Sequence, residues 1–402
     1  MAGRTAPRLS RSTGFAAVTA MLVLFMLAAG APTPLYVVYQ QRWGFPTSTL
    51  TLVFAVYVLG LLATVLVVGA LSDYIGRRLV LAAAVVLEVV ALVLFLAADG
   101  VAALLAARVV QGIATGAAIT TLSAAVVDFA PPQARGRAGV VTSVATLLGL
   151  AGGSVGAGAL VEFAPAPTQL VYLVLLAGAL VAAVITALLP ETAPRHAGVL
   201  ASLRPRVGMP AHMRAEFGSV LPILVASWAL GGLYLALGPS VAAGLLGITD
   251  HLVGGLVATL LCGSGALTAL LLRSWPLPRV LLAAAVLLAV GTAATLAAVD
   301  GGSAALAAIG TVVAGVGFGA AGLGAFGTMA ALAGPTERGE VFAMVYVVSY
   351  LAFSVPAVLA GVAANVVGLR LTALVYGAVV VVLSLVALVA RLRLGSRQTQ
   401  PA

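Results

Sequence analysis

The sequence has very little charge and almost none of the residues that bind metals. Only 8% of its 402 residues are charged, against roughly 25% in a soluble domain, so the chain lacks the residues to cover a water-exposed surface. The single cysteine, Cys262, lies in an apolar stretch, which excludes a disulfide framework and a thiolate metal site. His196, His212 and His251 lack metal-ligand spacing. We expect no metal and no cofactor.

Lysine is absent, and arginine supplies all of the positive charge. The net charge is +9, but the arginines are spread between apolar segments and do not form the basic patch that nucleic acid needs. No nucleotide-binding loop or catalytic cluster is recognisable, because the glycine-rich segments are apolar and no lysine follows them. We expect neither a nucleic-acid-binding protein nor an enzyme.

What the chain has in excess is long apolar stretches, in a composition that is 62% hydrophobic. A helix needs about 20 apolar residues to cross a bilayer. Stretches bounded by charges, proline or glycine predict spans near 14–38, 47–71, 79–98, 101–127, 137–161, 168–189, 218–243, 252–272, 279–299, 303–333, 340–364 and 368–391. The sequence therefore predicts an all-α integral membrane protein with twelve transmembrane helices.

The polar stretch 191–217 divides the chain into halves at 1–190 and 218–402, and the halves are related. A shift of 203 residues places Gly112 on Gly315 and Gly116 on Gly319. The loops that follow stay in register, since Pro132, Arg135 and Gly136 match Pro335, Arg338 and Gly339. We expect two pseudo-symmetric six-helix bundles joined by a central loop.

The arginines also predict the orientation of the chain in the membrane. With both termini on one side, seventeen of them fall on that side, whereas Arg42 and Arg370 fall opposite. Positive loops stay in the cytoplasm, so we expect cytoplasmic termini and a cytoplasmic central loop. The bias toward alanine, glycine, valine and arginine indicates a bacterial genome, and hence the bacterial plasma membrane. We expect a monomer in the lipid bilayer.

The loop after the second span carries the most specific motif, from Gly69 through Asp73 and Gly76 to Arg77 and Arg78. It resembles the signature loop of the major facilitator superfamily, whose members move small molecules by rocking two bundles about a central site. The resemblance implies a cytoplasmic gate of Asp73, Arg77 and Asp128, with Asp73 facing the start of the eleventh helix near Gly339 and Glu340. A plain positive loop and a helix-capping Asp128 are the alternatives.

Two charges lie within predicted spans. Arg108, Gln111 and Thr115 share one helical face, and Arg108 with Gln111 and Gly112 resembles the second motif of proton-coupled members of that superfamily. An arginine within a bilayer costs about 2.5–3.5 kcal/mol, so it should face a cavity or a partner. Glu88 lies halfway along the third span and is our candidate for proton coupling. A structural ion pair for Arg108 and a structural carboxyl for Glu88 are the alternatives.

Glycines on the fifth span resemble the antiporter motif of the same superfamily, with Gly153 where that motif has proline: Gly149, Gly152, Gly153, Gly156 and Gly158. Small residues at such spacing also occur wherever membrane helices pack closely. Pro190, Glu191 and Thr192 resemble the motif that ends the first half in many members. The sequence looks most like bacterial drug and metabolite exporters.

We expect a substrate cavity that is mostly aromatic and nearly free of charge. Its lining residues would be Tyr36, Tyr57, Arg108, Gln111, Trp228, Tyr234, Phe318, Tyr346 and Tyr350. Such a surface suits an uncharged or weakly acidic amphipathic molecule better than a sugar. The leading hypothesis is a proton-driven exporter. A symporter that imports a metabolite and a non-transporting membrane sensor or assembly partner are the alternatives, because a fold does not fix direction.

Overall fold

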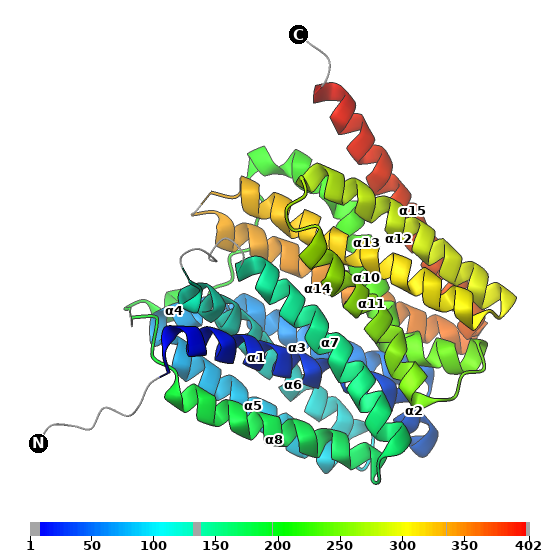
Figure 1. Ribbon diagram of the computed structural model, residues 1–402, viewed down its shortest axis with the longest axis horizontal. Helices are drawn as coiled ribbons and strands as arrows, with labels where there is room; N and C mark the ends of the chain where they lie inside the picture. Colours follow the sequence, from blue (N-terminus) through cyan, green and yellow to red (C-terminus); the bar gives the residue numbers. More distant parts are fainter. Residues whose placement is uncertain (1–8, 132–137, 195, 335, 399–402) are drawn as a thin grey trace, which may run out of the picture.

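The computed structural model describes residues 9–131, 138–194, 196–334 and 336–398, and within these ranges every regular element is a helix (Figure 1). Among the described residues, twelve helical segments are long and apolar enough to cross a membrane. They are α1 with α2 (Arg11–Gly30, Pro32–Trp43), α3 (Thr47–Val68), α5 (Arg77–Leu96), α6 (Val101–Phe129), α7 (Ala138–Phe163), α8 (Pro167–Leu188), α10 (Arg214–Leu245), α11 (His251–Leu271), α12 (Leu277–Gly301), α13 (Ala304–Leu332), α14 (Arg338–Val367) and α15 (Leu369–Gln398). The predicted number of spans is confirmed.

Short helices connect some of these spans. They are α4 (Leu71–Ile75), α9 (Val199–Ser202) and the 3₁₀ turn η2 (Ala211–Met213). The first span is itself divided at Ala31, where α1 ends and α2 begins with Pro32. Proline has no backbone N–H, so the carbonyl of Ala28 loses the helical partner it would have four residues later. This break releases a carbonyl deep in the first span.

Helices α1–α8 form one bundle and α10–α15 form the other, as Figure 1 shows. One cluster of buried side chains, including Val18 and Leu122, belongs entirely to the first bundle. Another, including Leu230 and Leu288, belongs entirely to the second. The architecture of two six-helix bundles is therefore as predicted, while the boundaries at 190 and 218 stay a prediction.

Equivalent glycines make equivalent helix contacts in the two bundles. In the first, a Cβ at Gly116 of α6 would lie 2.7 Å from the Leu61 carbonyl oxygen of α3. In the second, a Cβ at the matching Gly319 of α13 would overlap the Gly265 carbonyl oxygen of α11. Helices α3 and α11 are the second span of their respective halves, which agrees with the predicted repeat. The matched loop residues Pro132, Arg135, Gly136 and Pro335 lie outside the described residues.

The molecule has two ends that differ in charge. The arginine-rich end holds the first turns of α1, α5, α10 and α14, with Arg11, Arg77, Arg214 and Arg338. The arginine-poor end holds the connections from α2 to α3, from α10 to α11 and from α14 to α15. We use these two names below.

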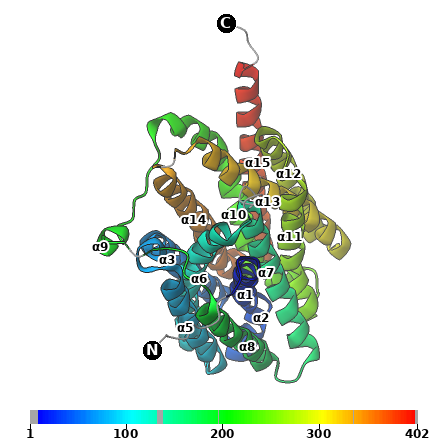
Figure 2. The same ribbon diagram turned by 60° about the vertical axis from the view of Figure 1, so that its left-hand side comes forward.

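The bundles touch each other from the middle of the membrane to the arginine-poor end. Helix α7 packs along α11 and α3 packs along α14 (Figure 2). The α7–α11 contact is between backbones, because a Cβ at Gly255 would lie 2.5 Å from the Ser154 carbonyl oxygen. In the α3–α14 contact, Asn365 Nδ2 donates to Ser48 Oγ at 2.8 Å. These contacts join the bundles at the arginine-poor end.

Candidate functional site

Arg108 of α6 lies inside the first bundle with only 1% of its surface exposed. Its Nη1 donates to Gln111 Oε1 at 2.6 Å, and its Nη2 donates to the hydroxyl of Tyr36. The guanidinium also lies over the rings of Tyr57 and Tyr36, at 4.6 and 5.4 Å from their centroids. A buried cation is stabilised by such ring contacts. The predicted grouping of Arg108 with these three residues is therefore observed.

Gln111 connects Arg108 to an acid on another helix. While its Oε1 accepts from Arg108, its Nε2 donates to Glu88 Oε1 at 3.3 Å and to the Ala28 carbonyl at 3.0 Å. That carbonyl is the one that Pro32 leaves without a helical partner. Because a carbonyl can only accept, it fixes the amide with its nitrogen toward Glu88 and its oxygen toward Arg108. Glu88 and Arg108 are thus linked through one amide and do not form a direct salt bridge.

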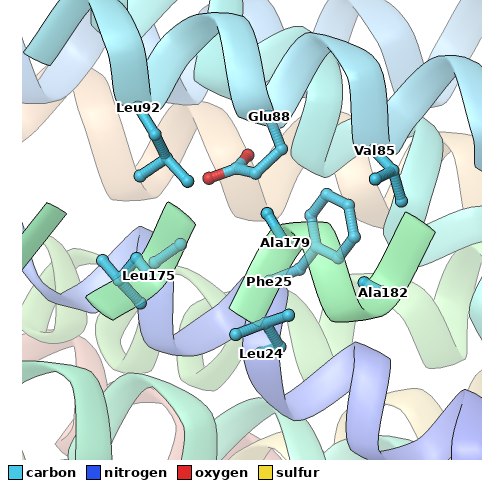
Figure 3. A pocket seen from close by; sticks show the side chains of 9 residues that line it. Leu24, Phe25, Val85, Glu88, Leu92, Leu175, Ala179 and Ala182 are labelled. Atoms are coloured by element: carbon cyan, nitrogen blue, oxygen red, sulfur yellow. The ribbon is translucent and has the colours of Figure 1, made fainter. Parts of the chain in front are cut away.

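Glu88 of α5 has one carboxylate oxygen that is still available. It is 3% exposed, and its Oε2 has no hydrogen-bond partner. The side chain borders a cavity of about 10 Å³ between α1, α5 and α8, together with Phe25, Leu92 and Leu175 (Figure 3). This volume is close to the minimum for one water molecule. The free oxygen can therefore receive a proton without displacing the bond from Gln111.

Aromatic side chains gather on α10, α13 and α14 of the second bundle. The Trp228 ring stands edge-on to Tyr350, with centroids 5.0 Å apart, and Tyr346 stacks on Tyr350 at 6.0 Å. Phe326 links the group, at 5.6 Å from Tyr346 and 6.4 Å from Trp228. The predicted residues Trp228, Tyr346 and Tyr350 therefore come together.

Sequence reasoning missed three members of this aromatic group, namely Phe326, Phe342 and Phe353. A signal for one of them was present, because Phe342, Tyr346 and Tyr350 recur every four residues, which places them on one face of a helix. Phe353 also meets Phe54 of α3 in the first bundle, with ring centroids 5.1 Å apart. The aromatic group thus begins at the contact between the bundles.

Two predicted cavity residues lie elsewhere in the second bundle. The Tyr234 hydroxyl is 3.0 Å from the Thr311 hydroxyl of α13 and 3.4 Å from that of Thr295 of α12. It therefore points into the helix packing and does not join the aromatic group. Phe318 lies between α10 and α11, where Cβ atoms at Gly231 and Gly265 would lie 3.2 and 3.3 Å from its ring.

The signature loop is built around a left-handed turn at the arginine-rich end. Gly76 has a φ of 102°, a conformation that favours glycine. Arg77 pairs with Asp73 and, through Nε at 3.2 Å, with Asp128 Oδ2 of α6. Its Nη1 also donates to Ser72 Oγ at 2.7 Å. Asp73, Arg77 and Asp128 are thus brought together within the first bundle.

Three more residues from the sequence analysis lie at this end, namely Arg78, Gly69 and Glu340. Arg78 donates to the carbonyls of Thr186 and Ala187 at 3.3 and 2.7 Å and so holds the end of α8. Gly69 ends α3, and a Cβ there would lie 3.8 Å from the Thr120 methyl group of α6. Glu340, the expected neighbour of Asp73, has its backbone carbonyl 3.5 Å from the Gly208 nitrogen of the central loop.

Glu191 and Thr192 belong to the signature-loop network, a role that sequence reasoning did not give them. Glu191 accepts from the backbone N–H groups of Arg77 and Arg78 at 2.8 and 3.1 Å, so it caps the N-terminus of α5. A Cβ at Gly76 would lie 2.6 Å from this carboxylate. The Thr192 hydroxyl donates to Asp128 Oδ2 at 2.8 Å. The residues that follow α8 therefore hold the signature loop in place through these hydrogen bonds.

The glycines of α7 differ in how closely they pack on α1. A Cβ at Gly149 would lie 2.7 Å from the Val23 carbonyl oxygen of α1, and a Cβ at Gly153 would overlap the Leu27 carbonyl. Gly152 is looser, with the Leu27 side chain at 3.0 Å, and a Cβ at Gly156 would meet nothing within 4 Å. Close packing on α1 therefore explains Gly149 and Gly153, but not Gly156.

A helical chain with twelve spans in two related bundles, and a buried polar network inside one of them, defines a multi-span membrane transporter. The sequence model of the Major Facilitator Superfamily matches residues 15–355 of this chain. The chain belongs to this superfamily. Its members use this fold for transport, which agrees with secondary transport by alternating access.

Solved structures show the same fold. A bacterial homologue of the human lysosomal transporter Spinster, inward-facing and unoccupied, is 16% identical with a TM-score of 0.75, covering 98% of this chain and 99% of that chain. Its occupied inward-facing form is 15% identical, with the same TM-score and coverage. The human organic anion transporter MFSD10 (TETRAN) is 18% identical with a TM-score of 0.69, covering 94% of this chain and 100% of that chain. At these identities the likeness concerns the fold alone.

Proposed function

We propose that this chain is a proton-coupled secondary transporter that imports an uncharged or weakly acidic amphipathic organic molecule together with a proton. The observation that carries the proposal is the buried connection from Glu88 through Gln111 to Arg108. A buried ionisable pair within a membrane is costly and is retained where it serves a pathway or a partner. Here it joins a group that can take up a proton to a cation that can attract an acidic substrate.

Glu88 suits proton coupling because its free oxygen is available while its other oxygen stays bonded. Protonation removes the negative charge that balances Arg108, so the cation becomes a better partner for a negative group in the substrate. Release of the proton restores the balance and weakens that attraction. The proton and an acidic substrate therefore bind together, so this coupling favours symport into the cell over the export that the sequence suggested. One proton moving down about 100 mV supplies roughly 2.3 kcal/mol, enough for about a fifty-fold substrate gradient.

The contacts between the bundles fit one of the two states of alternating access, and the distribution of arginines supports a cytoplasmic arginine-rich end. The described contacts join the bundles at the arginine-poor end, so this conformation is closed toward the outside in the proposed orientation. The two Spinster homologue structures are likewise inward-facing. The signature-loop gate of Asp73, Arg77 and Asp128 would act at the opposite end, when that end closes. We propose a monomer in the bacterial plasma membrane with both termini in the cytoplasm.

The test uses purified protein in liposomes that contain a pH-sensitive dye, with lipophilic acidic, neutral and cationic compounds added under an imposed pH gradient. We expect acidic or neutral compounds to drive proton movement, Arg108→Ala to abolish it and Glu88→Gln to uncouple it from substrate flux. Asp300→Asn removes a carboxylate from an exposed pair far from the network and is the matched control. Substrate flux without proton movement in the unmodified protein would reject proton coupling.

A further inference from the structure

The aromatic group of the second bundle has the properties of a binding surface for one kind of molecule. We call Trp228, Phe326, Phe342, Tyr346 and Tyr350 the aromatic wall. Its rings follow one another at centroid distances of 5.0 to 6.4 Å, from Trp228 on α10 across Phe326 on α13 to the three residues on α14. Such spacing leaves ring edges and faces available to a further flat ring.

The wall is not a sealed core. Trp228, Phe326, Phe342 and Tyr346 are only partly buried. In the described part of the chain, the hydroxyls of Tyr346 and Tyr350 have no hydrogen-bond partner, and neither oxygen is among the fully enclosed atoms that lack one. A tyrosine buried for packing alone usually bonds its hydroxyl, as Tyr234 and Tyr376 do here. The free hydroxyls can therefore serve a bound molecule.

The wall faces the charged network of the first bundle. At the arginine-poor side it adjoins Phe353, which packs on Phe54 of α3. One turn along α3 lies Tyr57, which belongs to the same hydrophobic cluster as Tyr350 and carries Arg108 over its ring at 4.6 Å. Aromatic faces also attract cations, but the buried charge in contact with Tyr57 is the positive charge of Arg108. The combination favours an anion over a cation.

We infer that the aromatic wall binds the flat ring of an aromatic carboxylic acid, with the carboxylate directed toward Tyr57 and Arg108. This inference names the substrate class within the proposed function and rests on it. The ring stacks against Trp228, Phe326 and Tyr346, while the tyrosine hydroxyls donate to polar groups on the ring. A saturated ring of the same size loses the stacking, and an amine in place of the acid meets a like charge.

Trp228 provides a direct measure of binding, independent of transport. Trp43→Phe and Trp275→Phe leave Trp228 as the only tryptophan of the chain. In this background, 1-naphthoate in detergent or liposomes should quench Trp228 fluorescence. Decahydro-1-naphthoate and 1-naphthylmethylammonium are then added as competitors. To displace 1-naphthoate, each should need at least about tenfold higher concentration than an aromatic acid that does not itself quench Trp228.

Variants separate the wall from its surroundings. Tyr346→Leu should weaken 1-naphthoate binding about tenfold, since stacking of one ring contributes on the order of 1 kcal/mol or more. Tyr346→Phe keeps the ring, so it should retain most of the binding and exclude a folding defect. Phe318→Leu removes an aromatic ring of the same bundle outside the wall and should leave binding unchanged.

Equal competition by the saturated acid, or equal loss in Phe318→Leu and Tyr346→Leu, would overturn the inference. The proposed function fails separately. If 1-naphthoate binds as expected but no compound moves protons in liposomes, the wall stands and proton coupling falls. If saturated acids drive proton movement and aromatic acids have no advantage, the coupling stands and the wall does not define the substrate.

Discussion

The backbone contact between α7 and α11 makes Gly255 a sensitive point for the balance between conformations. A Cβ there would lie 2.5 Å from the Ser154 carbonyl oxygen and 3.1 Å from the Val155 Cα. Both are backbone atoms that no rotamer change can move. Gly255→Ala therefore strains the closed arginine-poor end, and separating the bundles relieves that strain.

Overpacking of this kind costs typically about 1–3 kcal/mol. If about 2 kcal/mol of strain is present only while the arginine-poor end is closed, the equilibrium shifts about thirty-fold toward the form open at that end. Gly317→Ala is the matched control, because a Cβ there would also lie 2.5 Å from a backbone atom, the nitrogen of Leu288. That contact joins α13 and α12 inside one bundle, so its strain should lower the melting temperature without changing the relative position of the bundles.

The assay is a distance measurement by electron spin resonance between labels on the two bundles at the arginine-poor end. Phe163 of α7 and Val366 of α14 are 73% and 79% exposed and can be replaced by cysteine. The buried native Cys262 is changed to serine. We expect Gly255→Ala to increase the population with long distances and Gly317→Ala to leave it unchanged. The same distribution in all three proteins would refute the argument that this contact holds the end closed.

Two further outcomes follow from contacts at the same end and in the network. Glu162 of α7 accepts from the backbone and ring nitrogens of His251 of α11 at 3.0 and 2.9 Å. Because this pair is partly exposed, Glu162→Gln should raise the population with long distances by about threefold. Asp300→Asn breaks a pair within one bundle and should leave the distances unchanged. Pro32→Ala returns an N–H to the carbonyl that anchors the Gln111 amide, so the liposome assay should show several-fold weaker proton coupling, while Pro34→Ala should retain it.

The fold was readable from the sequence because bilayer thickness imposes a length on every apolar stretch. The predicted span 252–272 differs by one residue at each end from His251–Leu271. The first span was less well predicted, since 14–38 became Arg11–Trp43. Its helix resumes at Pro32 and continues to Trp43, beyond the apolar stretch, and hydropathy does not register such an extension.

The site was only partly predictable. Arg108 and Gln111 are three residues apart on one helix, so helical geometry alone brings them together. The bond from Gln111 to Glu88 depends on how α5 packs on α6, and the bond to Ala28 depends on a carbonyl freed by a proline in another helix. Tyr234 was misleading for a related reason. Its sequence neighbourhood is apolar on all sides, and the threonines that hold its hydroxyl lie on α12 and α13.

The two bundles resemble each other in their glycine contacts but differ in the chemistry inside their spans. The ionisable groups deep in the membrane, Glu88 and Arg108, belong to the first bundle, whereas the described charges of the second lie near its helix ends. The wall of rings belongs to the second. On the proposals made above, the first bundle thus takes up the proton and the second recognises the substrate. If both proposals hold, mutations in the second half of the gene can change which compounds are carried without changing the residues that couple transport to the proton gradient.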